Sequence, residues 1–219
     1  MRLLKIDPKN YQWLDPNDQC WYYGEYTSGG GWGASETNRQ ILNLKKGPGA
    51  KAGELHYKSV AVNYWGDALA KLITLEKTVG QCTFVPMPGS KPEGHAEYDD
   101  RIGKVLARMS AHHGGVDVRR LLKQNAERPA QHAGGGRKSP AEICDTLVVD
   151  YSLVPPPLAR TIIVVDDVIT MGASFAAAKT LLKELPNVEA VVGVFLAKTI
   201  WPVPDFPLIT PEQLKELLG

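Results

Sequence analysis

Residues 161–174 read TIIVVDDVITMGAS, and this stretch decides the class of fold. Residues 162–165 form a β-branched run, which is typical of a strand buried on both faces of a parallel sheet. Two adjacent carboxylates, Asp166 and Asp167, follow the run, and a turn containing Gly172 leads into a segment rich in helix-forming residues. The order of strand, turn and helix predicts one unit of an α/β fold.

The two carboxylates and the turn predict a binding site. Burying unpaired neighbouring charges is costly, so we expect Asp166 and Asp167 at the carboxyl end of the strand, where open α/β sheets bind ligands. The free N–H groups at the start of the following helix favour an anion. Thr170 and Ser174 add hydroxyl donors, and Gly172 lets the backbone approach closely. A sugar phosphate with a vicinal diol would satisfy both the anion site and the carboxylates.

A phospho-acceptor receiver domain also places an acidic pair after an apolar strand. Receivers resemble one another in carrying that pair near the start of the domain. Here only about 50 residues follow Asp167, too few for a typical domain of about 100 residues, so the receiver interpretation is not favoured.

From about residue 60 onward, helical and strand patterns alternate, which indicates a βαβ architecture. We therefore expect a largely parallel sheet with helices on both faces. The predicted helices span residues 62–73, 102–109, 172–186 and 211–218, and the predicted strands span residues 81–88, 116–123, 146–152, 161–167 and 188–199.

The first 55 residues differ in character from the rest. Aromatic residues and glycines crowd residues 13–33, and the segments 19–27 and 39–46 are expected to pair as strands. The aromatic rings could stack on a planar base, but a role in the core is favoured by the large area that they bury. We expect residues 1–55 to form a small N-terminal segment and residues 56–219 to form the main domain.

A chain of 219 residues with 43% apolar content can bury one sizeable core. It has no apolar stretch of about 18 residues, which a membrane span needs, and its start, MRLLKIDPKN, turns polar too early for a signal peptide. Its cysteines, Cys20, Cys82 and Cys144, show no C-x-x-C spacing, which argues against a zinc ribbon or a disulfide framework. We expect a cytoplasmic protein with no membrane partner.

The stretch VVDDVITMGAS resembles the phosphoribosyl-pyrophosphate (PRPP) binding motif of type I phosphoribosyltransferases. The resemblance implies the fold of that family, with residues 1–55 as a hood over the acceptor and residues 56–219 as the phosphoribosyltransferase core. It also implies that the acidic pair binds the ribose 2′ and 3′ hydroxyls and that the following loop binds the 5′-phosphate. The expected ribose and phosphate site comprises Asp166, Asp167, Val168, Ile169, Thr170, Met171, Gly172, Ala173 and Ser174.

Two further segments complete the expected site. The loop in FVPMPGSKPEGH, residues 84–95, follows a predicted strand and resembles the family's pyrophosphate loop in position. Residues 124–140 have almost no apolar anchor, and a loop of this length is usually functional or disordered. In the family, a mobile loop in this part of the chain closes over PRPP. We expect Pro88, Gly89, Ser90 and Lys91 to bind pyrophosphate, and Arg137 and Lys138 to reach it from the mobile loop.

The resemblance implies a Mg²⁺-dependent glycosyltransferase that transfers 5-phosphoribosyl from PRPP to a nitrogen acceptor, a nucleobase or an amine, and releases pyrophosphate. Asp166 and Asp167 are the expected catalytic residues, and they contact the metal only indirectly, because Mg²⁺ in the family lies mainly between substrate oxygens. Enzymes acting on 6-oxopurines place an aspartate base where Thr170 stands, so hypoxanthine and guanine are disfavoured. The expected partners are PRPP and a small-molecule acceptor, and a homodimer is allowed.

The layout after residue 60 is similar to that of ComF-type phosphoribosyltransferase-like proteins, which usually begin with a four-cysteine zinc ribbon that this chain lacks. This layout, together with a basic segment, indicates an alternative function as a non-catalytic, PRPP-sensing or nucleic-acid-associated protein. Residues 101–138 carry nine basic and two acidic residues in a chain of net charge +1. That basic segment suits a polyanionic ligand and solvated helix faces equally well, so nucleic acid remains the less favoured partner.

Overall fold

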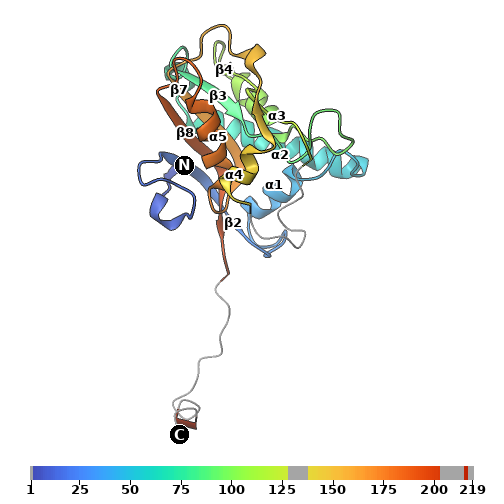
Figure 1. Ribbon diagram of the computed structural model, residues 1–219. Coiled ribbons are helices and arrows are strands. Elements are labelled where there is room, and N and C mark those ends of the chain that lie inside the picture. Colours follow the sequence, from blue (N-terminus) through green and yellow to red (C-terminus); the bar gives the residue numbers. More distant parts are fainter. Residues whose placement is uncertain (1, 128–137, 203–214, 217–219) are drawn as a thin grey trace.

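The computed structural model describes residues 2–127, 138–202 and 215–216 (Figure 1). Its centre is a six-stranded sheet with the strand order β1-β2-β8-β7-β3-β4. β1 runs antiparallel to β2, and every other neighbouring pair is parallel. The strands are β1 (Leu4–Lys5), β2 (Cys20–Thr27), β3 (Cys82–Pro86), β4 (Asp117–Val118), β7 (Thr161–Ile169) and β8 (Ala190–Ile200).

Helices cover both faces of this sheet, which confirms the expected α/β architecture with a mostly parallel sheet. Side chains of β7 alternate between the two faces: Ile162 and Val164 belong to one buried cluster, and Ile163 and Val165 to the other. This is why the strand reads as an unbroken apolar run. The first cluster is covered by α4 (Pro140–Cys144) and α5 (Ala173–Lys183), and the second by α1 (Glu36–Leu44), α2 (Ala52–Leu72) and α3 (Arg101–Ser110).

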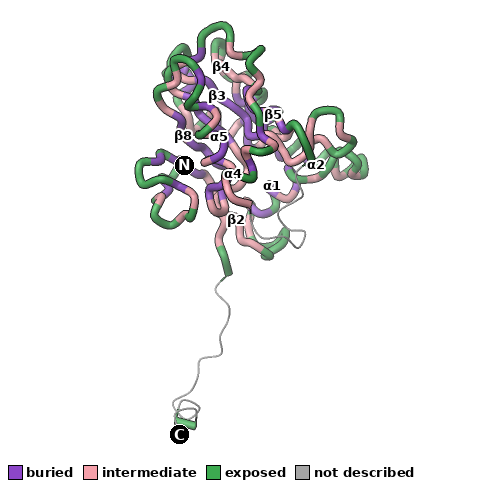
Figure 2. Tube along the Cα trace, viewed as in Figure 1, coloured by how far each residue is buried: buried purple, intermediate pink, exposed green. Residues whose placement is uncertain are grey.

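The buried residues follow the central strands and the inward faces of these helices (Figure 2). Short 3-10 helices occur in the connections between the main elements. They are Pro8–Asn10, Leu75–Lys77 and Tyr151–Leu153.

Two predicted strands differ from the expected parallel arrangement. The segment 116–123 is divided, because β4 joins the main sheet while β5 (Leu122–Gln124) pairs antiparallel with β6 (Leu147–Val149) in a separate two-stranded sheet. The strand expected over 146–152 is therefore present as β6, but it lies outside the main sheet. Leu122 and Leu147 anchor the small sheet by packing into the same buried cluster as α5.

The N-terminal segment is built into the main sheet. The expected strand over 19–27 is present as β2, but the segment 39–46, which was expected to pair with it, lies mainly in helix α1. Ser35 begins this helix by accepting a hydrogen bond from the backbone of Asn38, whose side chain in turn bonds the backbone of Thr27. The expected boundary at residue 55 falls inside α2, and β1, β2 and α1 belong to the central layers rather than to a separate part of the described chain.

Some expectations fall largely outside the described residues. Of the terminal helix expected over 211–218, only residues 215–216 are described, and they are helical. Across residues 2–127, 138–202 and 215–216, no helix combines the length and the apolar composition needed to cross a membrane.

Candidate active site

The acidic pair lies within the carboxyl-terminal half of β7. The strand continues to Ile169 because β8 pairs with it along most of its length, so Asp166 and Asp167 lie in the strand rather than beyond it. Both residues are partly buried. Successive strand residues point to opposite sides, and the contacts of Asp167 show that its side chain points towards α1 and α3.

Asp167 is held by two cations. The Lys45 ammonium lies 3.5 Å from Oδ1, and the Arg101 guanidinium lies 3.2 Å from Oδ2. The backbone N–H of Val168 donates to Oδ1 at 2.7 Å. Burial on its own would raise the pKa of this carboxyl, but Lys45, Arg101 and the Val168 N–H outweigh it and lower the pKa below its ordinary value. Asp167 is therefore a carboxylate at neutral pH.

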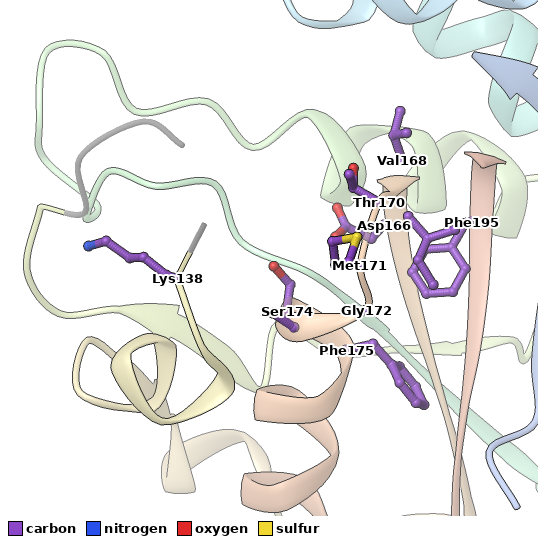
Figure 3. A pocket seen from close by; sticks show the side chains of 11 residues that line it. Lys138, Asp166, Val168, Thr170, Met171, Gly172, Ser174, Phe175 and Phe195 are labelled. Atoms are coloured by element: carbon purple, nitrogen blue, oxygen red, sulfur yellow. The ribbon is translucent and has the colours of Figure 1, made fainter. Parts of the chain in front are cut away.

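Asp166 faces the turn that follows β7. Its Oδ1 accepts a hydrogen bond from the backbone N–H of Asp167 at 2.8 Å. Its side chain lines a cavity of about 50 Å³ at the start of α5, together with the residues of the turn (Figure 3). Every residue of the expected phosphate loop lines this cavity: Val168, Ile169, Thr170, Met171, Gly172, Ala173 and Ser174.

The shape of the turn depends on Gly172. This residue precedes α5 with φ +89°, a left-handed conformation that side chains rarely adopt. A β-carbon here would also lie 2.8 Å from the Leu14 side chain, and the neighbouring Trp13 N–H donates to the Met171 carbonyl at 3.1 Å. The N-terminal segment thus supports the turn, and the first residues of α5, Ala173 and Ser174, line the cavity. Free N–H groups at a helix start favour an anion.

A larger cavity of about 770 Å³ connects the turn with the loop after β3. Pro88, Gly89 and Ser90 of the expected pyrophosphate loop line it, as do Asp166 and Asp167. The structure thus brings two segments that are about 80 residues apart in sequence to one cavity, because parallel strands end at the same edge of a sheet. β7 lies between β3 on one side and β8 and β2 on the other.

Lys91, Lys138 and Arg137 were also expected at the site. Lys91 lines neither of these two cavities, since its ammonium pairs with Glu127 and, at 3.4 Å, with Glu97. Lys138 lines the small cavity, but its ammonium points away from Ser174 (Figure 3). Arg137 lies outside the described residues.

The cavity also contains residues that the sequence did not single out as a group. Lys45 follows α1, Arg101 is the first residue of α3, and Tyr26 is the last residue but one of β2. Thr199 belongs to β8, and its hydroxyl lies 3.1 Å from that of Thr170. Arg101 was counted only as part of the basic segment 101–138, and Tyr26 only as one of the aromatic residues of 13–33. No local pattern marks Lys45 or Thr199, because these residues meet only through the fold.

Folding pairs much of the basic segment with carboxylates. Arg108 lies 2.6 Å from Asp67, Lys123 lies 2.6 Å from Asp150, and Arg119 lies 2.8 Å from Asp117. Arg120 pairs with Asp100, and Arg101 pairs with Asp99 and Asp167. The local positive charge along the sequence is thus partly balanced in space, which weakens the case for a basic nucleic-acid surface.

The donor set at the site bears on how a metal would bind. Within the part of the chain that the structure describes, no group of three or more His, Cys, Asp or Glu side chains is arranged to hold a metal ion. Asp167 is already paired with two cations. Among the described residues, Asp166 and Asp167 are the carboxylates that line the larger cavity, so they are the side chains that could contact a metal ion there.

The chain matches no protein-family model, and no curated protein matches it.

Proposed function

We propose that the protein is a phosphoribosyltransferase of the type I kind, which transfers 5-phosphoribosyl from PRPP to a nitrogen acceptor and releases pyrophosphate. One observation carries the proposal: an acidic pair, a helix N-terminus and a proline–glycine loop meet around two adjoining cavities, of about 770 Å³ and about 50 Å³. Those are the groups that a ribose diol, a 5′-phosphate and a diphosphate would need.

The mechanism follows from the charges around the cavity. The N–H groups at the start of α5, with Thr170 and Ser174, would bind the 5′-phosphate, and Asp166 and Asp167 would orient the ribose hydroxyls. As the bond from C1 to the diphosphate breaks and the acceptor nitrogen bonds to C1, positive charge develops on the ribose ring and negative charge on the leaving group. The proton that the acceptor nitrogen loses would pass to the released pyrophosphate or to water. The carboxylates would stabilise the first charge, and Arg101 with the loop after β3 would stabilise the second. Mg²⁺ bound to PRPP would neutralise diphosphate charge, and Asp166 and Asp167 are the carboxylates that would contact it indirectly, through the substrate.

The strand order suggests where the acceptor binds. The loop after β3 lies on one side of β7, so the opposite side, formed by the ends of β8 and β2, is available to the acceptor. Tyr26, Thr199 and Trp201 line the cavity there and offer aromatic surface and a hydroxyl group. A small planar acceptor would fit these groups by stacking and hydrogen bonding.

Turnover tests the proposal. The protein is incubated with Mg·PRPP and a panel of nucleobases and amines, and released pyrophosphate is measured. PRPP affinity is measured in parallel for the double variant Asp166→Asn/Asp167→Asn, with Asp145→Asn, an exposed aspartate after α4, as the matched control. Loss of PRPP binding in the double variant alone would support the assignment, whereas unchanged affinity would overturn it.

A non-catalytic, PRPP-sensing or nucleic-acid-associated protein is the second candidate, on the strength of the basic segment in the sequence. The ion pairs of Arg108, Arg119 and Lys123 count against its nucleic-acid version. Salt-dependent binding of DNA or RNA, with no pyrophosphate released for any acceptor, would favour this candidate. Failure to bind either DNA or RNA would exclude a nucleic-acid-associated function.

A further inference from the structure

Lys58 is a buried lysine in the first third of α2. Its side chain is only 9% exposed, and it lines none of the cavities described above. Burial lowers the pKa of its ammonium, and the contact with Asp99 opposes that effect. A buried ammonium needs partners that replace water, and Lys58 has two: the Asp99 carboxylate at 2.6 Å and the Lys46 carbonyl at 2.5 Å.

The first partner leads to the candidate site through Arg101. Asp99 is itself almost fully buried, and its second carboxylate oxygen accepts from the Arg101 Nε at 2.8 Å. The other end of the same guanidinium reaches Asp167 at 3.2 Å. A planar guanidinium fixed at one edge has little freedom at the other, so Asp99 determines where Arg101 meets Asp167.

The second partner leads to the same carboxylate by another route. Lys46 directly follows Lys45, whose ammonium lies 3.5 Å from Asp167. By binding the Lys46 carbonyl, Lys58 fixes the backbone just after α1, from which the Lys45 side chain extends into the cavity. The two routes therefore begin at one ammonium group and end on the two oxygens of one carboxylate.

Asp99 also contacts the loop on the other side of the cavity. Its backbone oxygen lies 3.4 Å from the point that a β-carbon at Gly89 would occupy. The residue that Lys58 holds thus packs against the loop expected to bind pyrophosphate, as well as orienting Arg101.

We infer that Lys58 is a positioning residue of the candidate active site, which holds Arg101 and Lys45 against Asp167 without touching a ligand itself. The inference deepens the proposed function and rests on it for the identity of the ligand. Its role would be to keep the two cations where the charges of PRPP require them. Stability alone does not account for a buried ion pair, because an apolar side chain of similar size is often as stabilising or more so.

The experiment separates this role from a merely structural one. Lys58→Met removes the charge and keeps an unbranched side chain, and Lys71→Met, on an exposed position of the same helix, is the matched control. The first readout needs no ligand: the NMR signal of the Arg101 Nε–H, which donates to Asp99, and its exchange with water. The second readout is PRPP affinity by calorimetry.

We expect Lys58→Met to shift the Arg101 signal, to speed its exchange and to weaken PRPP binding about tenfold, a coupling of ordinary size for residues in one network. Lys71→Met should change neither readout. In an Arg101→Gln background, adding Lys58→Met should weaken PRPP binding further by less than about threefold, because both substitutions interrupt the same contacts between Lys58 and Asp167. If the losses of PRPP affinity caused by Lys58→Met and Arg101→Gln are fully additive, the cause is general destabilisation, and the inference is overturned.

Two further outcomes keep the inference distinct from the proposed function. If the wild-type protein does not bind PRPP, the proposed function fails, and the Arg101 signal alone decides the role of Lys58. If Lys58→Met does not fold, Asp99→Asn interrupts the same route to Arg101 and leaves Lys58 bonded to the Lys46 carbonyl. An unchanged Arg101 signal in Lys58→Met, or in Asp99→Asn where that variant replaces it, would overturn the inference.

Discussion

The guanidinium of Arg101 lies 3.2 Å from the carboxylate of Asp167, although the two residues are 66 positions apart in the chain. Arg101 is the first residue of α3, and Asp167 lies near the end of β7. The pair therefore joins a helix start to a strand end at the edge of the sheet where the candidate site lies. It brings a cation close to a carboxylate that would bind ribose.

Replacing Arg101 by lysine should weaken PRPP binding about tenfold, because one ammonium cannot span Asp99 and Asp167 as the planar guanidinium does. Calorimetric titration with Mg·PRPP measures the change. Arg160→Lys is the matched control, since Arg160 is largely exposed and pairs only with Glu189 at 2.9 Å among the described contacts. Equal PRPP affinities for Arg101→Lys and the wild-type protein would show that the Arg101 guanidinium is not needed for PRPP binding.

Gly172→Ala should destabilise the fold by about 1–3 kcal/mol, because φ is +89° at this position and the added carbon would meet the Leu14 side chain. Urea unfolding measures the free energy of unfolding. Gly33→Ala is the control, because nothing lies within 4 Å of its added carbon. A loss of stability of the same size in both variants would show that the turn before α5 is not specially constrained.

The central strand and the turn could be predicted from sequence because each depends on neighbouring residues. The β-branched run of β7 is buried on both faces, and Gly172 is needed by the backbone that begins α5. Lys45 and Arg101 could not be found in this way, since nothing near either residue in sequence indicates that both meet Asp167. That convergence depends on packing α1 and α3 over the same face of the sheet.

The wrong assignment of residues 39–46 has a similar cause. Ile41 and Leu44 are three positions apart, a spacing that suits a helix, but the segment is short and apolar enough to suit a strand as well. Ser35, which caps α1, carried the signal that could have decided the matter. The position of β6 outside the main sheet had no such local signal, because it depends on antiparallel pairing with β5.

The stability of the protein should depend on Asp67 in acid. Hydrogen bonds from Arg108, and then from His112, lower the pKa of this carboxyl from 3.8 to about 2. When folding lowers the pKa of a carboxyl, the carboxylate stabilises the folded state fully above the pKa of the unfolded state. This stabilisation is lost as the pH falls through the pKa of the folded state. Asp67→Asn should therefore lower the free energy of unfolding at pH 7 by less than about 1 kcal/mol, since solvent screens this partly exposed cluster.

The difference between Asp67→Asn and the wild-type protein should then shrink as the pH is lowered from about 4 to about 2, the window set by the two pKa values. Urea unfolding across this pH range measures it, with Asp145→Asn as a control on an exposed aspartate. A difference that stays constant with pH would contradict the shifted pKa.

Tyr26 tests the expected position of the acceptor. Its ring lines the cavity at the end of β2, and the Lys45 ammonium lies 5.8 Å from the ring centre. If a planar acceptor stacks there, Tyr26→Ala should raise the KM for the acceptor about tenfold, as expected when an aromatic stacking partner is removed. The KM for PRPP should change less than about twofold, because the groups expected to bind PRPP lie around β7 and the loop after β3. Tyr57→Ala, on the exposed face of α2, is the control, and an increase confined to the KM for PRPP would place the acceptor elsewhere.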